Sequence, residues 1–82
     1  MKIYVFVEAY TPEEEYADIM QTKVFLHEDE AEDCLKKQKQ AYLDNAEDGE
    51  RWKVTFDANN YFHAIYDGNR DEVVMTIDTH EI

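Results

Sequence analysis

Three aspartates, Asp57, Asp67 and Asp71, are the residues of this sequence that could most readily support metal chemistry. Asp67, Asn69 and Asp71 occupy alternate positions, as ligands do in the first half of a calcium-binding loop. Glu72 stands where such a loop needs its central glycine, so a hairpin turn is the favoured interpretation. A divalent-metal-dependent nuclease built on the three aspartates stays open as an alternative, because two carboxylates and a metal can support phosphodiester hydrolysis.

Other kinds of catalytic site find little support. The chain has no serine, which excludes serine nucleophiles, and only Gly49 and Gly68, which exclude glycine-rich phosphate loops. The three histidines and the single cysteine show no zinc-ligand spacing. His63 has no identifiable nucleophile to activate, and Cys34 lies on the apolar stripe of a predicted helix, where a thiol is usually inert. We therefore expect a protein that is not an enzyme and needs no cofactor or metal.

Length and composition predict one small, acidic, folded domain that spans residues 1–82. The 82 residues include 20 acids and 8 bases, giving a net charge of −12, and 13% of the residues are aromatic, which is atypical of disordered chains. The negative charge disfavours direct binding to nucleic acid and to anionic membranes. The apolar run Ile3 to Val7 is too short for a signal peptide, and a lone cysteine is typical of a reducing compartment, so we expect a cytoplasmic location.

Hydrophobic periodicity predicts the elements that must position any site. Strands are expected at 3–10, 17–26, 52–56, 61–66 and 73–77, where apolar residues alternate with polar ones. A helix is expected from Glu28 to about Leu43, where apolar residues recur at three- and four-residue steps. The expected fold is α+β, in the order ββαβββ, with a single antiparallel sheet of four to five strands and one helix on one face.

The first strand has two apolar faces. We expect Ile3, Val5 and Val7 to face the helix. The alternate residues would then form an exposed aromatic and acidic surface suited to contact a partner: Tyr4, Phe6, Glu8 and Tyr10. Aromatic platforms that bind RNA carry lysine and arginine, so protein is the expected partner.

The first half of the chain resembles small uncharacterised bacterial and phage proteins that open with a Tyr-Val hairpin and continue into an acidic helix. The residues that carry the resemblance are Ile3, Tyr4, Val5, Val24, Phe25, Glu28, Ala31, Glu32 and Leu35. Those proteins commonly have a small hydroxyl residue after the phenylalanine, where this chain has Leu26 and His27. The resemblance implies the fold more than a function.

The excess negative charge lies outside the predicted helix. Residues 28–43 contain five acids and three bases, ordered so that they favour the helix dipole and the i,i+4 pairs Glu32–Lys36 and Asp33–Lys37. The remaining excess belongs to predicted loops and turns, where it serves either solubility or a basic partner. The candidate partner-binding acids in these segments are Glu13, Glu14, Glu15, Glu47, Asp48, Asp67, Asp71 and Glu72.

These observations favour a non-enzymatic, acidic interaction domain that holds a basic protein surface. In its sharpest form this is a nucleic-acid-mimicking inhibitor of a nucleic-acid-binding protein, of the phage or mobile-element counter-defence type. The sequence leaves two alternatives open: a homo-oligomeric scaffold or regulatory domain paired through its sheet as a homodimer, and the metal-dependent nuclease.

Overall fold

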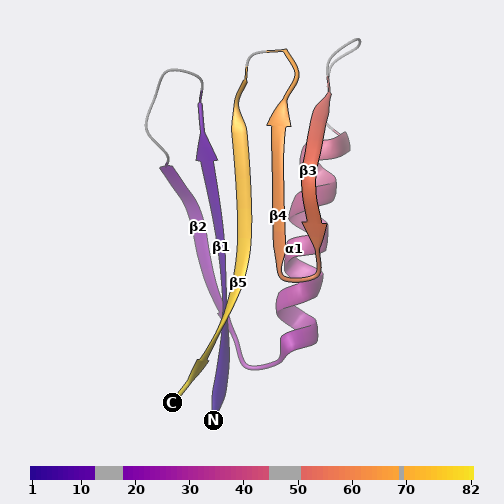
Figure 1. The fold of residues 1–82 in the computed structure, drawn as a ribbon. Coiled ribbons are helices and arrows are strands. Elements are labelled where there is room, and N and C mark those ends of the chain that lie inside the picture. Colours follow the sequence, from indigo (N-terminus) through magenta and orange to yellow (C-terminus); the bar gives the residue numbers. More distant parts are fainter. Residues whose placement is uncertain (13–17, 45–50, 69) are drawn as a thin grey trace.

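A computed structural model describes residues 1–12, 18–44, 51–68 and 70–82 of the chain. The elements appear in the predicted order, with one helix after the first two strands (Figure 1). Their bounds are β1 (Lys2–Thr11), β2 (Asp18–Phe25), α1 (Glu28–Asp44), β3 (Trp52–Ala58), β4 (Tyr61–Tyr66) and β5 (Glu72–Glu81).

The five strands form one antiparallel sheet in the order β2-β1-β5-β4-β3. Three hairpins connect neighbours in the sequence, and β5 pairs with β1 across the centre, so that Phe6 lies opposite Ile77. The carboxyl ends of β1 and β4 lie at one end of the sheet, and both chain termini lie at the other (Figure 1). The α+β fold and the ββαβββ order are confirmed.

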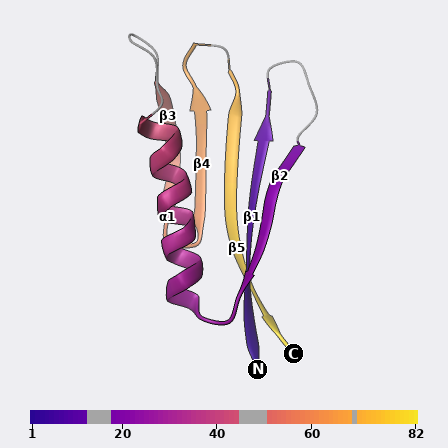
Figure 2. The ribbon, with the colours of Figure 1, turned by 180° about the vertical axis from the view of Figure 1, so that it is seen from behind.

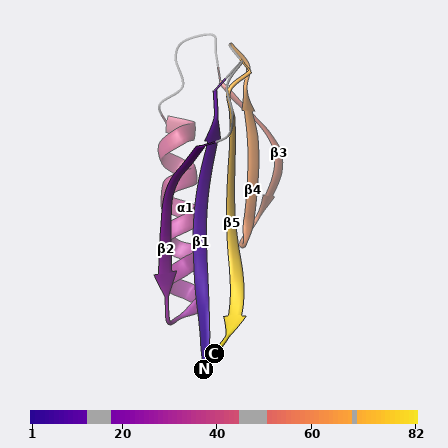
Figure 3. The same ribbon diagram turned by 90° about the vertical axis from the view of Figure 1, so that its left-hand side faces the viewer.

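Helix α1 lies against one face of the sheet (Figure 2). Its first turn carries three acids, which the helix dipole favours, and its first intrahelical-type bond runs from the Ala31 amide to the His27 carbonyl at 3.3 Å. Ala31 and Leu35, one helical turn apart, are buried against the strands. Seen from the side, α1 lies on one side of the layer formed by β5, β4 and β3 (Figure 3). Within the described residues, no helix is long and apolar enough to span a membrane.

The core lies between α1 and the sheet and reverses the predicted faces of β1. Phe6 is fully buried and Glu8 is only 5% exposed, so the residues expected to face outward face the helix instead. The register explains the reversal, because Phe6 and Glu8 pair with Ile77 and Met75, which belong to the uniformly apolar row of β5.

The opposite face of the sheet, called the outer face below, carries Ile3, Val5, Val7 and Ala9 of β1 together with the residues that the register places beside them on the neighbouring strands. Val5 and Val7 are partly exposed on this face. The prediction that they contact the helix was therefore wrong, and the prediction that Tyr4, Phe6, Glu8 and Tyr10 form an exposed surface was wrong with it.

Candidate functional site

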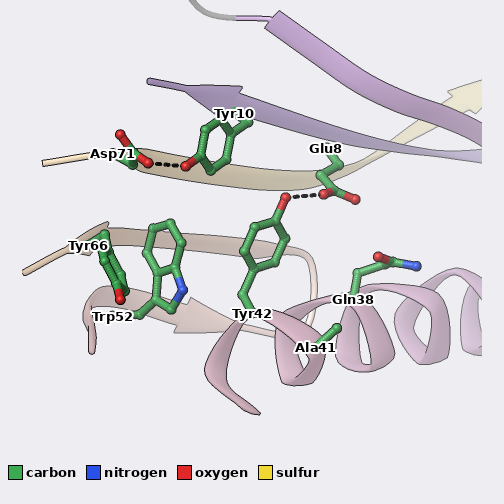
Figure 4. A pocket seen from close by; sticks show the side chains of 8 residues that line it. All are labelled: Glu8, Tyr10, Gln38, Ala41, Tyr42, Trp52, Tyr66 and Asp71. Atoms are coloured by element: carbon green, nitrogen blue, oxygen red, sulfur yellow. Dashed lines mark hydrogen bonds between the residues drawn. The ribbon is translucent and has the colours of Figure 1, made fainter. Parts of the chain in front are cut away.

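A pocket of about 400 Å³ lies between the last turns of α1 and the sheet end opposite the termini (Figure 4). It is called the aromatic–carboxylate pocket. Its residues come from the last part of β1, from α1, from the start of β3, from the end of β4 and from the turn before β5. They are Glu8, Tyr10, Gln38, Ala41, Tyr42, Trp52, Tyr66 and Asp71.

Glu8 is the buried carboxylate of this pocket. Its Oε1 accepts a hydrogen bond from Gln21 Nε2 at 2.6 Å, and its Oε2 accepts one from the Tyr42 hydroxyl. Both donors are neutral, and none of the described residues that line the pocket is Lys, Arg or His. Buried carboxylates usually have a cationic partner. Glu8 has none among the described residues of the pocket lining, so the ionised carboxylate gives the pocket a negative potential.

A β-bulge in β2 lies beside Glu8, which the alternation of β1 places on the same face as Phe6. The register of β1 against β2 shifts between Glu8 and Ala9, which leaves Met20 as the extra residue of β2. Bulges bend a strand locally and are common beside functional sites, because they redirect a side chain. Gln21 lies opposite Glu8 on the near side of the bulge and is thereby placed to hold the carboxylate.

Asp71 provides the second carboxylate, at the mouth of the β4–β5 turn. The turn is closed by a hydrogen bond from the Tyr66 amide to the Asp71 carbonyl at 2.7 Å, and Arg70 adopts a left-handed conformation with φ 66°. The Tyr10 hydroxyl donates to Asp71 Oδ2. Two tyrosines thus point their hydroxyls at the two acids (Figure 4).

Four aromatic rings pack around the pocket. The Tyr10 and Tyr42 rings lie nearly parallel, at 16° with centroids 6.3 Å apart, and the Trp52 ring stands almost perpendicular to Tyr42 at 5.4 Å. Tyr66 packs on Trp52 at 5.1 Å. Each ring contacts at least one other, so the walls are mutually braced and present several π-faces and edges within a small volume.

The pocket raises the pKa of both tyrosine hydroxyls above the ordinary value. Burial, followed by the hydrogen bond to Asp71 and its negative charge, raises the pKa of Tyr10 to about 12. Burial, followed by the hydrogen bond to Glu8 and its charge, raises the pKa of Tyr42 well above its usual value. A phenol is already neutral near pH 7, and the raised pKa values extend the pH range over which both hydroxyls donate hydrogen bonds.

The structure brings together three of the predicted partner-binding residues: Glu8, Tyr10 and Asp71. Phe6 is instead a core residue, and Tyr4 packs against the core on the helix side. Asp67 is exposed in the turn after β4, and its amide donates to the Arg51 carbonyl at 2.9 Å. Glu72 lies on the outer face, with its Oε1 2.8 Å from His63 Nε2. The remaining predicted acids, Glu13, Glu14, Glu15, Glu47 and Asp48, lie outside the described residues.

Three aromatic members of the pocket were not predicted: Tyr42, Trp52 and Tyr66. Tyr42 was assigned to the apolar stripe of the helix, and that stripe gave no sign that it ends beside a carboxylate. Trp52 pairs with Tyr66 across the β3–β4 hairpin, but the hairpin contains a register shift between Val54 and Phe56. Counting outward from the turn would place Tyr66 opposite Lys53, so the pairing cannot be read from sequence symmetry alone.

The three aspartates of the nuclease alternative lie at different ends of the β3–β4 hairpin. Asp57 pairs with Phe62 near the 58–61 turn and binds Lys39 Nζ at 2.8 Å. Asp67 and Asp71 flank the turn at the far end of β4, about four strand residues or ~13 Å away. Within the described residues, no group of three or more His, Cys, Asp or Glu side chains is placed to hold a metal ion.

A row of polar side chains crosses three strands on the outer face and was also not predicted. His63 Nδ1 contacts Thr55 Oγ1, and His63 Nε2 contacts Glu72 Oε1. The order hydroxyl, imidazole, carboxylate is that of a hydrolase triad, but catalysis also needs oxyanion donors in a shaped pocket. Thr55 Oγ1 also lies 3.2 Å from the backbone carbonyl of His63 and is placed to donate to it, as a hydroxyl that fixes a strand pair does. We interpret the row as cross-strand bonding.

Two further predictions concern α1. Lys37 Nζ lies 2.9 Å from Asp33 Oδ2, which confirms the Asp33–Lys37 pair, whereas no ion pair of the described residues joins Glu32 to Lys36. Burial raises the pKa of the Cys34 thiol, which lowers its thiolate fraction and agrees with a small packing residue.

Comparison of the chain with protein-family models, with curated proteins and with solved structures gives no significant match, so the geometry of the pocket is the basis for any functional conclusion.

Proposed function

We propose that this protein is a non-enzymatic interaction domain that captures a cationic side chain of a basic protein in its aromatic–carboxylate pocket. The observation that carries the proposal is Glu8, a carboxylate 5% exposed whose two donors, Gln21 and Tyr42, are both neutral. A carboxylate has room for about four hydrogen bonds, so Glu8 can accept further donors from a ligand.

The aromatic rings of the pocket, like the carboxylate of Glu8, favour a cationic ligand. The negative π-face of an aromatic ring attracts ammonium or guanidinium groups by roughly 0.5–2 kcal/mol, and tryptophan does so best. Trp52, Tyr10, Tyr42 and Tyr66 supply such rings within one pocket. A guanidinium can stack on a ring while it donates to a carboxylate, which makes arginine the best-matched side chain.

The size and charge of the molecule support a protein as the source of that cation. A volume of about 400 Å³ is at the small end of ligand sites and fits one long side chain. The net charge of −12 attracts basic surfaces and accelerates their encounter with the pocket. The same field opposes nucleic acid and anionic lipids, as the composition already predicted.

Nucleic-acid mimicry is the sharper form of this proposal and concerns a larger surface. It requires carboxylates spread over several loops, and the acids that would supply most of them are those outside the described residues. Mimicry and capture in the pocket make separable predictions. Mimicry spreads the binding energy over many acids, whereas the pocket concentrates it on Glu8 and its aromatic neighbours.

The fluorescence of Trp52 tests the pocket directly, because it is the single tryptophan of the chain and lines the site. The probe is N-acetyl-arginine amide, and its control is N-acetyl-citrulline amide, which is similar in shape but neutral. We expect a saturable fluorescence change with the arginine compound and none with the citrulline compound. Equal responses to both compounds would contradict the proposal.

A pair of isosteric variants separates the pocket from general acidity. Glu8→Gln and Glu72→Gln change the net charge equally, but only the first lies in the pocket. A hydrogen bond to a charged group is worth ~1.5–3 kcal/mol, so Glu8→Gln should weaken arginine binding at least ~10-fold. Glu72→Gln should leave it unchanged. Equal weakening by both would favour the mimicry form, in which each acid contributes to a distributed field.

A further inference from the structure

The middle of the outer face is apolar although 34% of the residues of this chain are charged. The register places Val7 beside Thr76 and Thr22, and Ala9 beside Val74, so that β1 and β5 form a band of small and β-branched side chains. Tyr61 continues the band on β4. On β3, Phe56 is 55% exposed and its ring packs edge-on against the Tyr61 ring, with centroids 5.3 Å apart. Alternation on a strand usually leaves polar residues on an open face. Here the polar residues, among them the Thr55–His63–Glu72 row and Asp78, lie around the apolar band.

The acids of the outer face lie away from the middle of this band. Glu72 is at the start of β5, with its Oε1 2.8 Å from His63 Nε2, while Asp78 is toward the other end of the same strand, opposite Val5. By contrast, the acidic first turn of α1 is on the opposite side of the sheet. The middle of the outer face, around Val7, Ala9 and Val74, therefore holds no acidic side chain, although the chain is strongly negative.

We propose that a second copy of this chain covers the outer face, so that two sheets pack face to face in a symmetric dimer. Five strands spaced ~4.8 Å apart and six to ten residues long offer roughly 500–800 Å² per subunit, close to the ~800 Å² that each partner buries in a stable complex. Sheets with apolar inner faces pack in this way at about −30° to form a sandwich.

Charge identifies the occupant as a second copy instead of a basic protein. A basic surface would find few carboxylates on this face to pair with, whereas an identical apolar face is self-complementary. Face-to-face packing also places the two α1 helices, with their acidic first turns, on the outside of the dimer. Each copy keeps its aromatic–carboxylate pocket on the helix side, so both sites can be occupied together.

Sedimentation of the full chain tests this proposal. The monomer mass is 9.8 kDa, and we expect the wild-type protein to sediment near twice that mass at high micromolar concentration. Because the two subunits repel each other by charge, association should strengthen when sodium chloride is added. Binding of arginine in the pocket should weaken with salt instead, so failure of either proposal is distinguishable from failure of the other.

Two valine-to-lysine variants locate the interface. Val7→Lys places an ammonium group in the middle of the outer face, and Val54→Lys makes the same change at a valine that is 42% exposed and pairs with Ala64, on the helix side. Burial of an unpaired charge costs several kcal/mol, so Val7→Lys should raise the dissociation constant at least ~100-fold, and Val54→Lys should not change it. Circular dichroism checks that both variants fold.

Three results would overturn the proposal. The first is a wild-type protein that stays monomeric at high micromolar concentration in high salt. The second is a dimer that folded Val7→Lys leaves intact, which would place the interface elsewhere. The third is equal loss of the dimer in both variants, which would show that the effect is not specific to the outer face. Should Val7→Lys fail to fold, the wild-type sedimentation result alone decides between monomer and dimer.

Discussion

Replacement of Phe6 by alanine should destabilise the protein far more than the same replacement of Phe56. Phe6 is fully buried beneath α1, whereas Phe56 is 55% exposed on the outer face. Truncation of a buried phenylalanine to alanine costs ~3–5 kcal/mol, because transfer free energy is lost and a cavity remains. Phe56 keeps less than half of its surface buried, so Phe56→Ala should cost ~1 kcal/mol.

The size of the effect decides how it is measured. A chain of 82 residues has a free energy of unfolding of ~4–12 kcal/mol, so Phe6→Ala removes a large part or all of it. Phe6→Leu, with an expected loss of ~1–2 kcal/mol, provides a variant that still folds. Unfolding in urea, followed by circular dichroism at low micromolar concentration to limit association, gives the three free energies.

The reasoning about the faces of β1 would be refuted if Phe56→Ala lost as much stability as Phe6→Ala. It would also be refuted if Phe6→Ala unfolded at the same urea concentration as the wild type. Phe6 would then lie on the exposed surface that the sequence suggested, and the pocket would lose Glu8, which shares its face.

Two further predictions concern charge. On titration with base, followed by phenolate absorbance, Tyr10 should ionise near its raised pKa of about 12, and Asp71→Asn should shift the pKa of Tyr10 back toward 10. Because tyrosine ionises at lower pH in the unfolded chain, the stabilisation from Tyr10 is present below pH 10 and is lost between pH 10 and about 12. Ionisation of Tyr10 at the usual pKa in the wild type would show that its hydroxyl does not bind Asp71. The melting temperature should rise by several degrees between ~0.05 and ~1 M sodium chloride, because screening reduces self-repulsion in a chain of net charge −12. A melting temperature that does not change with salt would mean that the acids do not destabilise the fold.

Most of the fold could be predicted because each element has its own local pattern. The change from alternating to three- and four-residue spacing at Glu28 marked α1, and the apolar row of Val73, Met75 and Ile77 marked β5. The faces of β1 could not be predicted, because both of its alternate rows are apolar. Only the pairing with β5, a contact between the two ends of the chain, decides which row is buried.

The pocket depended on the same long-range information. Glu8 on β1, Tyr42 on α1 and Trp52 on β3 are far apart in the sequence, and each has an ordinary local role. Strand alternation placed Glu8 and Tyr10 on an exposed surface, and helical periodicity placed Tyr42 on an apolar stripe, so neither pattern brought the three together. In the structure, Tyr10 and Tyr42 instead direct their hydroxyls to carboxylates beneath the helix end.

The reversal of β1 links the two binding proposals. One strand places Glu8 and Tyr10 in the pocket and, by the same alternation, Val5 and Val7 on the outer face. The two properties must respond to salt in opposite directions, because the pocket depends on charge attraction and the outer face on apolar contact against charge repulsion. If arginine binding and self-association both weakened with added salt, association would be held by ion pairs, and the apolar outer face would not be the interface.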